Sequence, residues 1–214
     1  GNGGVTTVSP KLFLTAQGSF ILFVTQPLGG NTASLNQDNS LGVTYSVSSD
    51  GKIWSNYFPL SSSGNLQNVY LPYHVSSGGR EHVVFQASPS NSRFYHLYYI
   101  SSRDNGKSWS DPSWITDLSE DDISSVDFDN QRVFLKEDNR NVYLSWERKL
   151  GSGAPSPYYG QLNTVTGQLG SYEKIAGTGL SPNPVNNPQL YISGGEPVVL
   201  WYNNIGQVVL AGKE

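Results

Sequence analysis

The 214-residue sequence contains no cysteine and no methionine. Without cysteine the chain can form neither disulfide bonds nor thiolate metal sites. Cysteine usage therefore does not indicate whether the protein resides in an oxidising or a reducing compartment. Without methionine, Gly1 is not the translated start, so we expect a processed, truncated or tagged product. Such a product fits a protein that is secreted or exposed on a surface.

Charged side chains are also scarce, at 14% of the residues, and the net charge is −4 at pH 7. The 13 Lys and Arg are scattered along the chain, whereas nucleic-acid binding needs them clustered on one surface. No apolar run reaches the length that spans a membrane, and no lipidation motif occurs. We therefore expect neither a nucleic acid partner nor membrane insertion.

Helical patterns are missing as well, because every window of helical length is interrupted by Gly, Pro or β-branched residues. Turn-forming and aromatic residues are abundant instead: 23 Gly, 12 Pro, 13 Tyr, 8 Phe and 5 Trp. This composition is typical of many short strands joined by turns. The sequence predicts a single all-β domain.

Residues 102–109 form one segment that predicts a specific hairpin turn, with the order Ser-Arg-Asp-Asn-Gly-Lys-Ser-Trp. The side chain of Asp104 can accept hydrogen bonds from backbone amides further along the turn, and Gly106 tolerates a positive φ. Ser102 opens the turn, and the ring of Trp109 is expected to fold back over it. An upstream segment has the same residue types, Ser48, Asp50, Gly51 and Trp54, with one residue fewer between Asp and Gly.

These two segments resemble the Asp box, or BNR repeat, found in the outer hairpins of sialidase-like β-propellers. Two copies about 55 residues apart, each after an aromatic-rich strand, make the match more specific than a single octapeptide. The resemblance implies a propeller fold and a structural role for the eight box residues, far from an active site.

The chain also repeats a four-strand unit. Its second strands align at separations of roughly 55 to 62 residues, as Ile21-Leu22-Phe23, Val83-Val84-Phe85, Leu144-Ser145-Trp146 and Val199-Leu200-Trp201. We expect one propeller domain over residues 1–214 with about four blades of four antiparallel strands, at 9–64, 65–122, 123–181 and 182–214. In the third blade, residues 164–167 replace the Asp box, so ordinary turn chemistry must hold that hairpin.

The expected strands cover residues 11–16, 19–25, 43–48, 54–60, 69–75, 81–87, 94–100, 109–115, 133–136, 142–147, 158–163, 172–176, 189–192, 197–202 and 207–211. The fourth unit is one strand short, while a β-prone segment at residues 5–8 precedes the first blade. We expect this segment to complete the last blade and close the ring, which removes two sheet edges. The alternative is that the chain is a fragment of a larger propeller.

The resemblance to sialidases would also imply an arginine triad, a tyrosine nucleophile paired with glutamate, an aspartate acid/base and an Arg-Ile-Pro motif. The Arg-Ile-Pro motif is absent, and most of the arginines stand at or beside predicted turns, on blade peripheries. The arginines are Arg80, Arg93, Arg103, Arg132, Arg140 and Arg148. The sequence therefore favours a chain that is not an enzyme.

Paired carboxylates are the remaining route to glycoside hydrolysis, which needs two of them across a cleft. Asp127 and Asp129 flank Phe128 just before an inner strand, so alternation places both on one face near the propeller mouth. They are the catalytic candidates if the chain is an enzyme, and the alternative is a solvated loop or a turn capped by aspartate. The acidic loop at 117–122 lacks calcium-loop spacing, and we expect no metal and no cofactor.

Aromatic and amide side chains gather near the expected inner-strand ends and loops. Such groups stack on sugar rings and hydrogen-bond to them without large charge, although they also fill the core of any propeller. The candidate ligand-binding residues are Tyr70, Tyr73, His74, Tyr158, Tyr159 and Asn187.

Three functions stay open from the sequence. The favoured one is a non-catalytic recognition or adhesion module that binds glycan or a protein partner at an extracellular or virion surface. The second is a sialidase-related glycoside hydrolase or a fragment of one, and the third is an architectural subunit of a larger assembly.

Overall fold

The computed structural model describes residues 10–27, 41–60, 66–89, 95–116, 128–138, 141–150, 156–175, 186–202 and 208–212. These residues form fifteen β-strands and no helix. A helix long and apolar enough to cross a membrane is accordingly not found among them. The expected all-β fold is confirmed.

The first two sheets each contain four antiparallel strands in chain order. The first sheet consists of β1 (Pro10–Leu14), β2 (Phe20–Pro27), β3 (Leu41–Ser48) and β4 (Phe58–Pro59). The second sheet consists of β5 (Leu66–Ser77), β6 (Arg80–Pro89), β7 (His96–Ser102) and β8 (Ser113–Trp114).

The third sheet again has four antiparallel strands, and the fourth has three in the part of the chain described. The third consists of β9 (Phe128–Glu137), β10 (Val142–Leu150), β11 (Ser156–Asn163) and β12 (Gln168–Lys174). The fourth consists of β13 (Asn186–Ser193), β14 (Glu196–Tyr202) and β15 (Val208–Gly212).

Each strand expected from the sequence is present, although the observed ends differ from the expected ones. Strands β4 and β8 have only two residues each, because residues 49–57 and 103–112 form turns and irregular structure after β3 and β7. Strand β9 begins at Phe128, earlier than expected, so Asp129 lies inside the strand and not before it.

The sheets stand face to face and bury three apolar cores between them. The aligned second strands supply a large buried ring to each sheet, with exposed fractions of 4% or less for Phe23, Phe85, Trp146 and Trp201. Each ring removes an aromatic surface from water between neighbouring sheets. Four-stranded antiparallel sheets packed in this way are propeller blades, and the expected fold class is confirmed.

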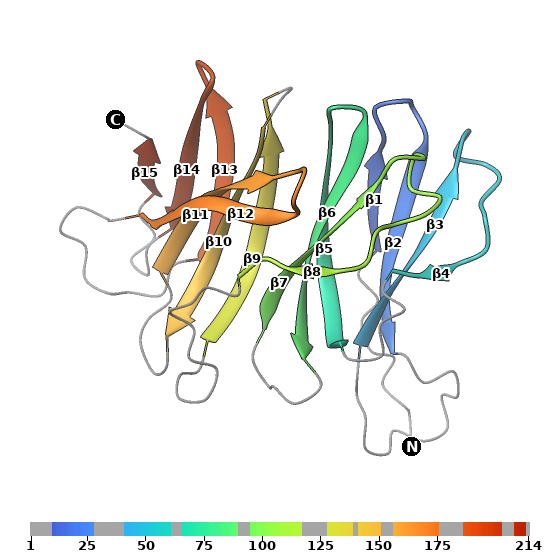
Figure 1. Cartoon of the computed structure of the whole chain (residues 1–214), viewed down its shortest axis with the longest axis horizontal. Coiled ribbons are helices and arrows are strands. Elements are labelled where there is room, and N and C mark those ends of the chain that lie inside the picture. The colour runs from blue at the N-terminus through green and yellow to red at the C-terminus, as the bar shows by residue number, and fades with distance from the viewer. Residues whose placement is uncertain are drawn as a thin grey trace.

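In Figure 1 the blades form a row from the blue strands β1–β4 at one end to the red strands β13–β15 at the other. The hairpins that join β1 to β2, β5 to β6 and β13 to β14 lie at the upper end of this view. The expected closing strand at residues 5–8 lies outside the described residues, so ring closure stays a prediction.

The hairpin at residues 102–109 has the turn hydrogen bonds that its sequence predicts. The backbone amide of Ser108 donates to Oδ1 of Asp104 at 2.9 Å, and the Ser108 hydroxyl donates to Oδ2 at 2.6 Å. The amide of Gly106 donates to Oγ of Ser102 at 2.9 Å, and Gly106 has a φ of 82°. Burial opposes ionisation, but these hydrogen bonds outweigh it and lower the pKa of Asp104.

Trp109 joins this hairpin to the first blade. Its ring centroid lies 6.0 Å from that of Phe23 and 6.0 Å from that of Tyr45, and the Tyr45 hydroxyl donates to the carbonyl of Lys107 at 3.2 Å. The box therefore holds its own turn and also fastens blade two to blade one.

The upstream segment at residues 48–54, which has one residue fewer, forms a similar set of hydrogen bonds around Asp50. Oδ1 of Asp50 accepts hydrogen bonds from the amides of Lys52 at 2.8 Å and Ile53 at 2.9 Å, while Oγ of Ser48 accepts one from Gly51 at 2.9 Å. The indole of Trp54 donates to the Gly51 carbonyl at 3.3 Å.

In the third blade, Asn163 takes over the part of the missing aspartate. Its Oδ1 accepts hydrogen bonds from the amides of Val165 at 3.0 Å and Thr166 at 3.1 Å. Gly167 completes the turn with a φ of 71°. An asparagine turn of this kind is ordinary turn chemistry, as the sequence predicted.

Candidate functional site

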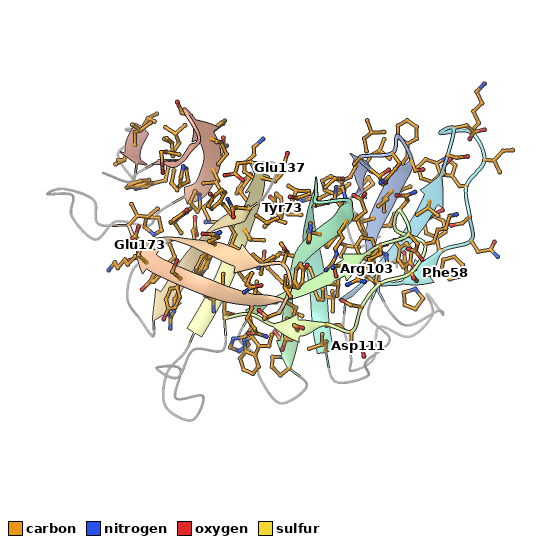
Figure 2. All side chains as sticks on the ribbon, turned by 45° about the horizontal axis from the view of Figure 1, so that its top comes forward. Phe58, Tyr73, Arg103, Asp111, Glu137 and Glu173 are labelled. Atoms are coloured by element: carbon orange, nitrogen blue, oxygen red, sulfur yellow. The ribbon has the colours of Figure 1, made fainter. Side chains whose placement is uncertain are left out.

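The first strands of the blades lie along the concave side of the molecule. Figure 2 shows Tyr73 of β5 and Glu137 of β9 on this side, and Phe58, Asp111 and Glu173 along the opposite, convex edge. Residues of β1, β5 and β9 line a cavity of about 520 Å³ there. We refer to the surface formed by these three strands as the central cleft.

Arg132 interrupts the regular pairing of β9 in this region. Ser145 pairs with Phe134 and Glu147 pairs with Gln131, so Arg132 and Val133 together oppose a single residue of β10. This is a β-bulge, and Arg132 has a φ of 54°. A left-handed conformation of a non-glycine residue inside a strand costs on the order of 1–3 kcal/mol and is typical of functional sites.

Buried polar side chains from two blades hold the bulge in place. Gln86 of β6 accepts a hydrogen bond from the Arg132 amide at 3.2 Å, and its Nε2 donates to the Asn130 carbonyl at 3.4 Å. The indole of Trp146 donates to Oδ1 of Asn130 at 3.0 Å. Gln86, Asn130 and Trp146 are fully buried, so the backbone at Arg132 is fixed by groups that cannot easily move.

The side chain of Arg132 is fixed by Glu147. Nη1 of Arg132 donates to Oε1 of Glu147 at 3.0 Å and to Oε2 at 2.8 Å. The Glu147 side chain is 1% exposed and needs a cationic partner, whereas the Arg132 side chain keeps 40% of its surface exposed. We refer to Arg132, Glu147 and the three buried supports as the arginine site. It presents a guanidinium at a defined position, which suits recognition of a carboxylate or sulfate group.

Two positions after Arg132 in β9, Phe134 belongs to a row of two aromatic rings and a lysine from the three inner strands. The ammonium of Lys11 on β1 lies 3.5 Å from the ring centroid of Tyr73, and the Tyr73 ring lies 4.9 Å from that of Phe134 on β9. Burial lowers the pKa of Lys11 to about 8. The cation–π contact keeps this ammonium beside an aromatic surface.

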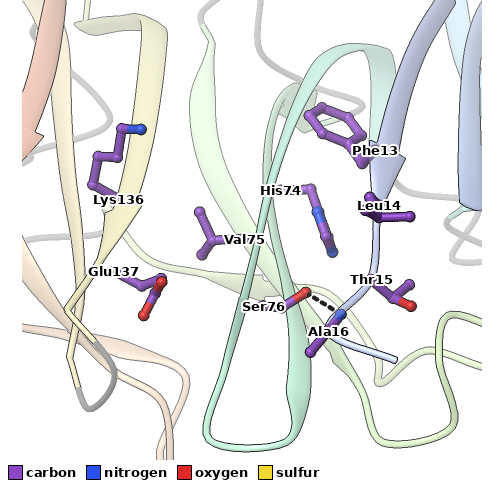
Figure 3. A pocket seen from close by; sticks show the side chains of 9 residues that line it. All are labelled: Phe13, Leu14, Thr15, Ala16, His74, Val75, Ser76, Lys136 and Glu137. Carbon is purple, nitrogen blue, oxygen red and sulfur yellow. Dashed lines mark hydrogen bonds between the residues drawn. The ribbon is translucent and has the colours of Figure 1, made fainter. Parts of the chain in front are cut away.

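At the end where the inner strands enter their hairpins, the cleft deepens into the cavity shown in Figure 3. We refer to it as the hairpin pocket. Its lining residues are Phe13, Leu14, Thr15, Ala16, His74, Val75, Ser76, Lys136 and Glu137.

The structure distributes the sequence-predicted ligand residues between cleft and core. Tyr73 and His74 lie on the cleft strand β5, as described above. Tyr158 is 9% exposed and packs its ring against Trp146 in the core, and its ligand role stays a prediction. Tyr159 lies on the third strand of its blade and stacks on Tyr143 at 6.1 Å, and burial raises its pKa well above the ordinary value.

Other predicted residues fall partly or wholly outside the described region. Asp127 is not described, and Asp129, Tyr70 and Asn187 are described only through their backbone positions in β9, β5 and β13. Asp129 pairs with Lys149 of β10, three positions before Arg132. The catalytic and ligand roles of these four residues stay predictions.

The sequence missed the arginine site. It placed most arginines at blade peripheries, but Arg132 lies in the inner strand β9 and Arg148 is buried in β10. The adjacent charges of Glu147 and Arg148 directly after the buried Trp146 were the available signal, because charges at the end of a buried strand need partners. The bulge that turns Arg132 toward Glu147 has no such signal.

Within the described ranges, no group of three or more His, Asp or Glu residues is arranged to hold a metal ion. The acidic residues at 117–122 lie outside those ranges.

No protein-family model matches the chain. A search of curated proteins likewise gives no match.

Solved structures do resemble the fold. The Hadza microbial sialidase Hz136 has a TM-score of 0.63 at 15% identity, over 95% of this chain and 43% of its own. The Trypanosoma rangeli sialidase in complex with the inhibitor DANA has a TM-score of 0.63 at 12% identity, over 98% of this chain and 36% of its own. A PL25 ulvan lyase bound to -[GlcA(1-4)Rha3S]- has a TM-score of 0.62 at 15% identity, over 97% of this chain and 56% of its own.

The chain thus spans less than two thirds of the length of each of these three proteins. At these identities the likeness establishes the fold alone. The chain has the sialidase-like β-propeller fold in its described part.

Proposed function

We propose that the chain is a recognition module that binds an acidic glycan through Arg132. The observation that carries this proposal is the contact of Arg132 with Glu147, which fixes a half-exposed guanidinium on an inner strand. A pre-positioned guanidinium pairs with a sugar carboxylate or sulfate without first losing its own conformational freedom.

Two further observations support a sugar as the ligand. Tyr73 and Phe134 offer ring surface in the same cleft, and rings of this kind stack on the apolar faces of sugars. Propellers with a similar fold include two sialidases and a lyase bound to a glucuronate-containing fragment. An extracellular or surface location, where such glycans are displayed, is part of the proposal.

The test compares acidic glycans with neutral counterparts of the same length, sialyllactose against lactose and a uronate oligosaccharide against a neutral one. We expect binding of at least one acidic member and a weaker affinity at high salt, because ions screen an exposed charge pair. Arg132→Gln should lower that affinity roughly 10-fold to 100-fold, the equivalent of about 1.5–3 kcal/mol for a charged hydrogen bond.

Arg103→Gln is the matched control, since it removes the same charge from an exposed turn on the outer hairpin. Arg132→Lys should recover only part of the affinity, because an ammonium lacks the planar fork of the guanidinium. Equal affinities of Arg132→Gln and Arg103→Gln for every acidic glycan would refute the proposal.

A glycoside-cleaving enzyme is the second candidate, favoured by the position of Asp129. This residue lies on β9 three positions before Arg132, so a carboxylate and an arginine share one inner strand. Turnover of a chromogenic acidic glycoside that disappears in Asp129→Asn or Asp127→Asn would establish this function in place of simple recognition.

A further inference from the structure

The hairpin pocket combines apolar and polar walls. In Figure 3, Phe13 and Leu14 come from β1 on one side, Lys136 and Glu137 come from β9 on the other, and β5 lies between them. The Phe13 ring also packs on the His74 ring, with their centroids 5.2 Å apart. Such a cavity can receive a ligand that has one apolar face and polar groups around its edge.

A buried hydrogen-bond network holds the wall that β5 forms. Nε2 of His74 lies 2.6 Å from Oε2 of Glu81, and the side chains of these two residues are 3% and 1% exposed. The hydroxyl of Ser76 donates to the same carboxylate oxygen and accepts a hydrogen bond from the Ala16 amide at 3.1 Å. Burial alone would raise the pKa of Glu81, but the hydrogen bonds from His74 and Ser76 outweigh it and lower the pKa.

The network lies behind the wall of the pocket, and two of its members, His74 and Ser76, line the pocket itself. Oε1 of Glu81 is buried and has no hydrogen-bond partner in the structure as described. His74 lines the pocket, and its Nε2 faces the Glu81 carboxylate behind it.

The charges around the pocket disfavour an anionic ligand. Lys136 supplies an ammonium and Glu137 a carboxylate on one wall, and Glu81 adds a second carboxylate behind the other. This balance does not favour an anion. A sugar hydroxyl both donates and accepts, so neighbouring hydroxyls can bind an ammonium and a carboxylate together.

We propose that the hairpin pocket is a binding site for an uncharged sugar residue, with the sugar ring against Phe13 and its hydroxyls toward His74, Lys136 and Glu137. The inference extends the proposed function: the uncharged residue belongs to the same glycan whose acidic residue meets Arg132. Lys136 lies four positions after Arg132 in β9, or about 13 Å along the strand at 3.3 Å per residue, a span suited to a short oligosaccharide.

The experiment follows backbone amide signals by NMR while single sugars are added to the full chain. The neutral probes are the methyl glycosides of glucose, galactose, mannose, xylose, rhamnose and fucose, and the acidic probes are glucuronate and sialic acid. At least one neutral probe should shift the amides of Ala16, Ser76 and Lys136 in a saturable manner. The acidic probes should shift the amide of Arg132 instead.

Exposed Lys136 allows a variant that does not disturb the core. Lys136→Ala should lower the affinity for the neutral probe roughly fivefold, as expected for one lost hydrogen bond. Glu137→Gln should lower this affinity by a similar factor. Lys52→Ala, at an exposed position in the first Asp box, should leave the affinity unchanged. If no neutral probe shifts the pocket amides at tens of millimolar, or if the Lys136 and Lys52 variants bind alike, the inference is wrong.

This experiment tests the arginine site and the hairpin pocket independently. Loss of every response to the acidic probes, with the neutral response kept, would refute recognition at Arg132 and leave the pocket as a neutral-sugar site. The opposite pattern would refute the pocket and leave the proposed function standing.

Discussion

Arg132 and Glu147 are fifteen positions apart in the sequence, yet Nη1 of Arg132 lies within 3.0 Å of both carboxylate oxygens of Glu147. The pair joins an exposed cation to a buried anion, since the two side chains are 40% and 1% exposed. The contribution of this pair to folding stability and its contribution to ligand affinity can therefore be measured separately.

Removal of Arg132 should destabilise the fold, because it leaves the Glu147 carboxylate buried without this partner. We expect Arg132→Gln to cost about 2–4 kcal/mol, below the value for a fully buried pair because the guanidinium is partly solvated. The double variant Arg132→Gln/Glu147→Gln should regain part of this loss in urea unfolding. Additive effects of the two single changes would contradict a direct coupling.

Alanine substitutions at Gly106 and Gly18 allow the cost of backbone strain to be distinguished from the cost of steric overlap. Both have a φ of 82°, but a Cβ at Gly106 would lie 2.6 Å from Cδ1 of the buried Ile21, whereas one at Gly18 has no neighbour within 4 Å. We expect Gly18→Ala to cost about 1 kcal/mol and Gly106→Ala about 2–4 kcal/mol in thermal or urea unfolding. Ile21→Val should reduce the excess cost at Gly106, and an unchanged excess would exclude Ile21 as its cause.

The Asp box at residues 102–109 should support stability and not binding. Asp104→Ala leaves turn amides without acceptors and should cost about 1–3 kcal/mol. Trp109→Ala removes the ring packed on Phe23 and Tyr45 and should cost about 3–5 kcal/mol. Exposed Asp111 provides the control, Asp111→Ala, for surface charge. A loss of glycan affinity in Asp104→Ala with unchanged unfolding would contradict the structural role.

His96 should make the fold sensitive to mild acid. Burial lowers its pKa from 6.5 to about 4, and its ring packs 4.3 Å from Trp114. Between these two pKa values the unfolded chain binds the proton and the folded chain does not, so stability falls as the pH drops from 6.5 toward 4. His96→Gln should flatten this slope in urea unfolding at pH 7, 6 and 5. An unchanged slope would show that other groups, such as His82 with its lowered pKa, account for it.

Residues 5–8 should complete the last blade. Deletion of residues 1–8 removes the expected closing strand and opens a sheet edge, so the thermal midpoint should fall by several degrees. Deletion of residues 1–4 keeps the segment and is the control. Equal midpoints of the two deletions would count against closure by this strand.

The local structure could be predicted from the residues alone. The repeated unit placed the second strands, which carry buried rings such as Phe85 and Trp146, and the Ser-x-Asp order predicted the turn around Asp104. These features depend on residues close together in the chain, where strand period and turn chemistry act directly. The sequence also showed that the aspartate is missing in the third blade and predicted an ordinary turn there. In the structure Asn163 provides the hydrogen bonds of that turn.

The contacts between polar residues of different strands and blades could not be predicted in this way. The arginine site depends on a bulge in β9 and on Gln86 from the neighbouring blade, and the hairpin pocket brings His74 of β5 opposite Lys136 of β9. Tyr158 and Tyr159 have adjacent positions in β11, but one ring entered a core and the other stacked on Tyr143. Strand register and the packing of one blade on the next fix these contacts, and both are collective properties of residues far apart in the chain.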